Sequence, residues 1–202
     1  MIIGIDEVGR GPIAGPVCVA AFFVPQPAYF KKLLKKAIEE HKLPLRDSKK
    51  LSALQRASWH KLARTWKKEG HCFFAITSIQ AKTIDRIGIS LSIQKALNSS
   101  LQKVHIQSRH FSSVTLLLDG GLHAPKHYTK QKTIIRGDEK EYAIALASIV
   151  AKEHRDRYMR KIAKLYPNYG FESHVGYGTK AHYAAIKKHG RTDIHRTSFL
   201  GS

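Results

Sequence analysis

Short apolar runs bounded by turn-forming residues predict the strands of this chain. Ile2 to Asp6 and Pro16 to Val24 indicate two strands joined by a glycine-rich turn, and HCFFAITSI, residues 71–79, indicates a third. SSVTLLLDGG, residues 112–121, predicts a strand that stops at an acid and two glycines. A further strand is expected over Lys132 to Ile135.

The segments between these runs repeat apolar residues every three or four positions, which is the helical period. Ser52 followed by Gln55 is a capping-box pattern that opens one such segment. Helices are expected over residues 28–42, after Ser52, over Ile89 to Val104, from Glu139 to about Tyr166, and from about Thr179 to His189.

The alternation of strands and helices predicts an α/β fold, a mixed sheet with helices on its faces. Polar residues at the strand ends of such sheets line the ligand crevice. One boundary is expected, near Pro167. It separates a main body, residues 1–166, from a small C-terminal helical segment, residues 167–202.

The charge of the chain indicates which class of partner it binds. The 202 residues carry 35 Lys and Arg against 15 Asp and Glu, a formal net charge of +20. A protein surface with this net charge favours the binding of a polyanion, because each Lys or Arg that neutralises a phosphate releases condensed counterions. Nucleic acid is the first candidate. An anionic membrane surface is the alternative, since the predicted helix over residues 28–42 sets an apolar stripe beside lysines.

Two further features bear on location. The longest apolar run, Val17 to Val24, is far too short to span a bilayer, which needs about 20 residues. Cys18 and Cys72 lie in separate apolar runs without metal-ligand spacing, as expected of small core residues. With no secretory signal pattern visible, we expect a cytoplasmic protein without a membrane segment.

Acidic residues at the ends of predicted strands are the candidate functional residues. Side chains alternate along a strand, so Asp6 and Glu7 can share a site only if the strand ends there, and Gly9 and Gly11 permit that turn. The alternative is that Glu7 is a solvated turn residue. Asp119 ends a strand before two glycines, which exposes its carboxylate.

A fourth acid, Asp156, continues the apolar face of the helix predicted from Glu139. The alternative for Asp156 is an ion pair with Lys152 or Arg160 one turn away. Acids that converge in a basic protein repel one another unless cations lie between them. Hard divalent ions fit oxygen ligands, and the pattern therefore favours a metal-dependent nuclease.

The motifs also resemble those of a known family, ribonuclease HII. The matching stretches follow the family's order over essentially the whole chain: GIDEVGRGPIAGPV, DSKKLS, LLLDGG, GDEKEYAIALASIVAKEHRDRYM and YGFESHVGYGTKAHYAAIKKHGRTDIHRTSF. The resemblance implies a ribonuclease H-like sheet with a small C-terminal helical segment.

The resemblance also implies roles for individual residues. Asp6, Glu7, Asp119 and Asp156 would be the catalytic and metal-binding acids, with Mg²⁺ or Mn²⁺ as cofactor. Substrate-binding residues would be Gly9, Arg10, Gly11, Lys49 and Tyr177. Glycine backbone can approach a 2′-hydroxyl, the group that distinguishes ribose from deoxyribose. Lys50, Lys140 and Lys152 also match basic family positions, and Gly178 stands where the family usually has proline.

The activity that the resemblance implies is endonucleolytic. A monomer would cleave the phosphodiester 5′ to ribonucleotides in RNA/DNA hybrids and in duplex DNA with embedded ribonucleotides, leaving 3′-hydroxyl and 5′-phosphate ends. Ribonuclease HIII is one alternative, although it usually has lysine where this chain has Arg10. A catalytically silent nucleic-acid-binding protein would explain the charge but not the placement of the acids.

The histidines do not indicate a zinc site, because neither HExxH nor a Cys/His cluster is present. His174, His182, His189 and His195 either add positive charge to the C-terminal segment when protonated, or cap and pack.

Overall fold

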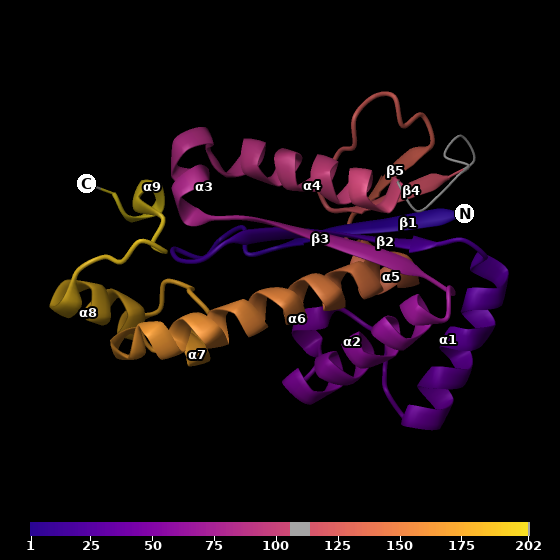
Figure 1. The fold of residues 1–202 in the computed structure, drawn as a ribbon, viewed down its shortest axis with the longest axis horizontal. Helices are drawn as coiled ribbons and strands as arrows, with labels where there is room; N and C mark the ends of the chain where they lie inside the picture. Colours follow the sequence, from indigo (N-terminus) through magenta and orange to yellow (C-terminus); the bar gives the residue numbers. More distant parts are fainter. Residues whose placement is uncertain (106–113, 202) are drawn as a thin grey trace.

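The computed structural model describes residues 1–105 and 114–201 (Figure 1). Within them, five strands form one mixed sheet in the order β3-β2-β1-β4-β5. The central strand β1 runs antiparallel to β2 and parallel to β4. The strands are β1 (Ile2–Val8), β2 (Val17–Val24), β3 (Phe73–Ile79), β4 (Thr115–Asp119) and β5 (Gln131–Ile134).

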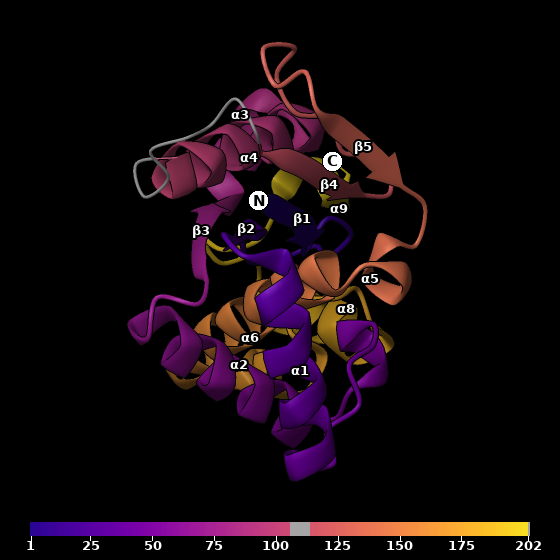
Figure 2. The same cartoon turned by 90° about the vertical axis from the view of Figure 1, so that its right-hand side faces the viewer.

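Helices cover both faces of the sheet, so the predicted α/β class is confirmed (Figures 1 and 2). Helices α3 and α4 lie over one face, and α6 packs on β1 and β2 at the other, with α1 and α2 beside it. The helices are α1 (Pro27–His41), η1 (Ser48–Lys50), α2 (Ala53–Lys68), α3 (Ala81–Ile87), α4 (Ile89–His105), α5 (Gly137–Lys140), α6 (Tyr142–Leu165), η3 (Pro167–Tyr169), α7 (Phe171–His174), α8 (Lys180–His189) and α9 (Thr197–Leu200).

Side chains alternate along β1, so its apolar residues pack into the core on both faces of the sheet. Ile3 and Ile5 pack with α4, whereas Val8 packs with α6. Gly4 lies directly under α6, and a Cβ there would be 2.1 Å from the carbonyl carbon of Ala143. The missing side chain therefore allows α6 to cross β1 at close range, which brings the N-terminal part of α6, with Ser148, next to Asp6.

The predicted helix starts are largely confirmed. Ser52 and Gln55 form the full capping box at the start of α2. Thr179 caps α8, accepting a hydrogen bond from the His182 N–H. The apolar stripe of α1, formed by Phe30, Leu34 and Ala37, packs into the core. Because this stripe is buried in the core, α1 does not present it to a membrane surface.

The predicted bounds of three elements are wrong. Strand β1 continues past Asp6 to Val8, because its pairing with β2 runs on to Cys18. The single helix expected from Glu139 is two helices, since Glu141 is extended and separates α5 from α6. β5 also begins and ends one residue earlier than expected. Residues 112 and 113 of the SSVTLLLDGG stretch lie outside the described residues.

Cys18 and Cys72 are buried free thiols, as expected of core residues. Burial raises the pKa of Cys72 to about 12, so this thiol is not a nucleophile at neutral pH. In the part of the chain that the structure describes, no helix is long and apolar enough to cross a membrane.

Candidate active site

Three acids meet where β1 passes the end of β4. The last paired residues of these parallel strands are Ile5 and Leu118, so Asp6 and Asp119 stand one position beyond the pairing. Asp6 is buried, whereas Glu7 and Asp119 are half-buried. The pairing of β1 with β4 ends at Ile5 and Leu118, so the β4 side of β1 is open from Asp6 onward, although β2 stays paired on the other side. Asp6 and Glu7 therefore both approach Asp119 although β1 does not end between them.

The charges of these acids act on one another. Burial raises the pKa of Asp6 well above its ordinary value; a hydrogen bond from Ser148 opposes that rise, and the charges of Glu7 and Asp119 add to it. Burial also raises the pKa of Glu7, against the attraction of Arg10 and with a contribution from Asp119. The site therefore holds more negative charge than its own cations neutralise.

A further acid, Asp138, belongs to this cluster and was missed in the sequence. Burial raises the pKa of Asp138 to about 6, and the nearby charges of Asp119 and Asp47 add to the rise. The Gly137 N–H donates to Asp119 Oδ1 at 2.6 Å, which ties the start of α5 to the end of β4. A Cβ at Gly137 would lie 2.5 Å from Ile144 Cδ1 and 3.2 Å from Asp119 Oδ1, so a larger residue would crowd this contact. An acid beside a glycine shortly after a predicted strand was the available signal, although Asp138 follows its glycine whereas Asp119 precedes the two glycines of LLLDGG.

Asp156, predicted as the fourth acid, lies in a different environment. It is buried on the inner face of α6, as expected. Its carboxylate accepts from Lys152 Nζ at 2.5 and 2.7 Å and from Arg56 at 3.3 Å. The largest influences on the pKa values of Asp6, Glu7 and Asp138 come from burial and from other residues, not from Asp156. The structure therefore supports the ion-pair alternative for Asp156 and brings Asp138 to the other acids instead.

The donor set fits a hard divalent cation by its chemistry. Asp6, Glu7, Asp119 and Asp138 supply carboxylate oxygens, the ligands that Mg²⁺ and Mn²⁺ prefer. Among residues 1–105 and 114–201, no three acidic, His or Cys side chains already stand in position to share one ion. Asp119 Oδ1 instead accepts from Gly137, and Asp6 Oδ1 accepts from the Glu7 N–H at 2.7 Å.

The glycine-rich loop after β1 reaches the Tyr177 loop. The Gly176 carbonyl accepts from the Ile13 N–H at 2.9 Å and from the Ala14 N–H at 3.1 Å. Tyr177 follows at once, with its side chain 40% exposed. Gly11 has open space around its Cα, so a ligand can approach the backbone there. The structure thus places the predicted substrate residues of the two loops on adjoining segments.

Two fully buried arginines hold the glycine-rich loop, and sequence reasoning missed both. Arg196 donates to the carbonyls of Gly9 (2.6 Å), Arg10 (3.0 Å) and Gly15 (2.9 Å). Arg155 donates to the carbonyls of Pro16 (2.9 Å), Ala14 (3.1 Å) and Val175 (2.9 Å). A planar guanidinium that satisfies three carbonyls fixes a backbone path without any carboxylate partner.

The predicted phosphate-binding lysines differ in their surroundings. Lys49 is exposed, and its charge acts on both Glu7 and Asp138. Lys50 pairs with Glu139 at 2.5 Å, and Lys140 donates to the Ile135 carbonyl at 2.8 Å. With Lys152 bound to Asp156, Lys49 is the lysine best placed beside the acids.

A family comparison decides how this site is classified. The sequence model of the ribonuclease HII family matches residues 3–201. The chain belongs to the ribonuclease HII family. As a member of this family it is a hydrolase, a nuclease of the ribonuclease H type.

Curated ribonuclease HII relatives match the chain over its whole length. The protein of Pelodictyon phaeoclathratiforme is 40% identical over 98% of this chain and 89% of its own length. The protein of Prochlorococcus marinus is also 40% identical, over 98% of this chain and 94% of its own. The protein of Chlamydia abortus is 39% identical, over 98% and 84%.

Solved structures share the fold at lower identity. RNase HII from Archaeoglobus fulgidus, solved as a PCNA complex, superposes with a TM-score of 0.71 at 20% identity, over 99% of this chain and 94% of that one. Bst-RNase HIII, solved in complex with Mn²⁺, gives 0.65 at 17% identity, over 98% and 66%. These likenesses confirm the ribonuclease H-like architecture.

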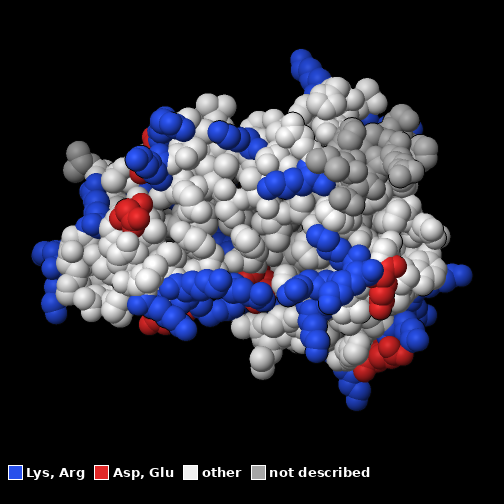
Figure 3. Space-filling model, viewed as in Figure 1, with Lys and Arg blue, Asp and Glu red and all other residues white. Residues whose placement is uncertain are grey.

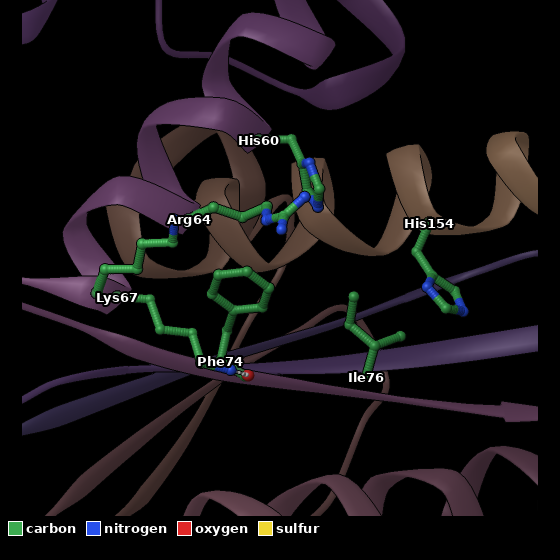
Figure 4. A pocket seen from close by; sticks show the side chains of 7 residues that line it. His60, Arg64, Lys67, Phe74, Ile76 and His154 are labelled. Atoms are coloured by element: carbon green, nitrogen blue, oxygen red, sulfur yellow. Dashed lines mark hydrogen bonds between the residues drawn. The ribbon is translucent and has the colours of Figure 1, made fainter.

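The chain also has a cavity of about 530 Å³ between α2, β3 and α6 (Figure 4). Its lining includes the cations Arg64, Lys67 and Lys68. A band of Lys and Arg crosses the face that carries α2 and α6 (Figure 3). In Figure 2, β3 and α2 lie on the side away from β5 and α5. The cavity is therefore separate from the acid cluster, and its Lys67 is engaged with the Phe74 carbonyl at 3.2 Å.

Proposed function

We propose that this ribonuclease HII family member hydrolyses the phosphodiester on the 5′ side of ribonucleotides, in RNA/DNA hybrids and in duplex DNA with embedded ribonucleotides. The products would carry 3′-hydroxyl and 5′-phosphate ends. The observation that carries the proposal is the meeting of Asp6, Glu7, Asp119 and Asp138 at the end of β4 in a chain of charge +20. We further expect it to act in the cytoplasm as a monomer.

In this proposal the four acids hold divalent cations, Mg²⁺ or Mn²⁺. The raised pKa values of Asp6, Glu7 and Asp138 support this assignment, because a bound cation would relieve the repulsion that raises them. The Mn²⁺ complex of Bst-RNase HIII supports the same ion class. When bound, a pair of such ions supplies a nucleophilic water and stabilises charge on the leaving oxygen of an in-line displacement.

The residues of this chain supply substrate binding and orientation. Arg196 holds the Gly9–Arg10–Gly11 turn by its bonds to the Gly9 and Arg10 carbonyls, and the backbone of the two glycines, which carry no side chains, would approach the 2′-hydroxyl of the ribonucleotide. Tyr177, half exposed on the adjoining loop, would stack on the neighbouring sugar. Lys49 beside the acids would bind a phosphate near the scissile bond.

A duplex with one embedded ribonucleotide tests the proposal. We expect wild type with Mg²⁺ or Mn²⁺ to cut at one position, 5′ to the ribonucleotide, and Asp6→Asn to bind the duplex but not cut it. Glu40→Gln, on the exposed face of α1, is the matched carboxylate-to-amide control and should cut normally. Cleavage that persists with chelator, or near-normal turnover by Asp6→Asn, would contradict the metal assignment.

A further inference from the structure

Three histidines are buried directly behind the Tyr177 loop. His174 is 9% exposed, His182 0% and His195 2%. They come from α7, α8 and the turn before α9, and they surround the ring of Phe171. The rings of His174 and His182 stack with centroids 4.4 Å apart. Of the two readings open from the sequence, packing therefore holds for these three, and solvent-facing positive charge does not.

The hydrogen bonds determine which ring nitrogen carries the proton in His195 and in His182. The Thr192 N–H donates to His195 Nδ1 at 2.8 Å, so the proton of neutral His195 is on Nε2. That Nε2–H donates to His182 Nε2 at 3.0 Å, which leaves the His182 proton on Nδ1. The Nδ1–H of His182 then donates to the Tyr177 carbonyl at 2.8 Å. The chain from Thr192 to Tyr177 is satisfied at every step by one tautomer of each ring.

His174 closes the other side of the same loop. Its Nδ1 accepts from the Gly176 N–H at 3.2 Å, and its carbonyl accepts from the Tyr177 N–H at 2.9 Å. Gly176 has a positive φ of 88°, and a Cβ there would lie 2.3 Å from the Ala14 carbonyl oxygen. The peptides on both sides of Tyr177 are therefore fixed, by the His174 carbonyl before it and by the buried His182 imidazole after it, while the Tyr177 ring itself stays accessible.

The surroundings keep the rings of His182 and His195 neutral near pH 7. Burial lowers the pKa of His182 to about 4; the Tyr177 carbonyl opposes this, and the nearby His174 and His195 add to it. Burial also lowers the pKa of His195; the charge of Asp193 opposes this, and Arg191 and His174 add to it. A second proton on His182 Nε2 would face the donor Nε2–H of His195, which the geometry does not accommodate.

We propose that His182 and His195 are positioning residues that set the angle at which Tyr177 meets the nucleic acid. The inference rests on the proposed role of Tyr177 as a substrate-binding residue. His182 never touches substrate in this scheme. It acts through the Tyr177 carbonyl, and His195 fixes the tautomer with which it does so.

The tautomers of the wild-type protein provide a test that needs no variant. Long-range ¹H–¹⁵N correlation spectra at pH 7 should show His182 protonated on Nδ1 and His195 on Nε2, both neutral. A charged His182, or one with its proton on Nε2, would overturn the proposal whatever the activity assays show.

Variants of His182 test the function of the pair. His182→Leu removes the donor to Tyr177, and we expect KM for a single-ribonucleotide duplex to rise about 2- to 10-fold with kcat within about twofold. His182→Asn keeps a donor in the place of Nδ1 and should recover most of the loss. His189→Leu, at an exposed position on the same helix, is the matched control and should leave KM unchanged.

A double-mutant cycle with Tyr177→Ala separates positioning from general loss of structure. If His182 acts through Tyr177, His182→Leu adds no further rise in KM once the ring is gone. An equal further rise would overturn the positioning role while leaving the Tyr177 assignment intact. If Tyr177→Ala alone leaves KM unchanged, the proposed role of Tyr177 fails and the positioning role fails with it.

Discussion

Asp138 and Asp156 show how the same side chain acquires different chemistry from its neighbours. Asp156 is neutralised by Lys152 and Arg56 and is held among protein donors. Asp138 lies beside other acids. Burial raises its pKa to about 6, and the charges of Asp119 and Asp47 add to the rise. Only the environment of Asp138 needs an external cation to neutralise its negative charge.

The first prediction follows at this scale. Asp138→Asn should lower kcat/KM by roughly 100-fold or more, because an amide is a poor ligand for a hard cation. Asp156→Asn is the matched comparison and should lower thermal stability, since it leaves two partly buried cations without their carboxylate. Steady-state cleavage and thermal unfolding of both variants check this. Cleavage lost in Asp156→Asn but retained in Asp138→Asn would restore the original assignment.

At the scale of elements, the glycine-rich loop is held from the far end of the chain. Arg196 and Arg155 reach six carbonyls between them, five of them in residues 9–16. Burial lowers the pKa of Arg196 to about 10, with a contribution from Arg155, yet it remains charged at neutral pH. The C-terminal segment therefore shapes the substrate-binding turn rather than only adding a surface to it.

Arg196→Lys tests that role. A lysine keeps the charge but lacks the planar fork, so carbonyls of the loop lose their donors, and we expect a loss of about 2–4 kcal/mol in the free energy of unfolding. KM for a ribonucleotide-containing duplex should rise in parallel. Urea unfolding and cleavage kinetics measure the two effects. The control is Arg191→Lys, an exposed position whose change should be nearly silent.

At the scale of the whole molecule, basic side chains spread well beyond the acid cluster (Figure 3). A net charge of +20 gives a long-range attraction for polyanions that does not depend on sequence. The acids sit inside this field and would repel phosphate without cations. Binding and cleavage are therefore expected to respond differently to monovalent and divalent salt.

The salt dependence of binding is the corresponding prediction. Each neutralised phosphate adds about −0.9 to the slope of log affinity against log salt, so a footprint of several phosphates gives about −3 or steeper. Asp6→Asn bound to an uncut duplex allows the titration without cleavage. A slope near zero would rule out a phosphate-tracking surface, independently of the family.

Acid sensitivity of the whole fold is the last prediction. The pKa values of His182 and His195 are lowered from 6.5 in the folded protein, to about 4 for His182, so the unfolded chain binds protons that the folded chain does not. Their contribution to stability is complete above about pH 6.5 and is lost as pH falls toward 4. Urea midpoints between pH 7.5 and 4.5 should fall, and should fall less in His182→Asn.

The sequence by itself determined the elements and the strand-end acids of this protein. Hydrophobic period and capping chemistry are local, so α2 with its Ser52–Gln55 box and the strands around Asp6 and Asp119 could be predicted from neighbours along the chain. The helix predicted from Glu139 is two helices, because Glu141 is extended, and the start of α5 is tied to β4 by the hydrogen bond from Gly137 to Asp119.

Only the tertiary structure decided which acids share a site and what holds the substrate loops. Whether Asp138 or Asp156 joins Asp119 depends on charges that come from α2, α5 and β4, which are far apart in sequence. Arg196 is 187 residues from Gly9, and the neutral tautomers of His182 and His195 depend on each other. Burial and pairing set these properties, and both arise between segments rather than within them.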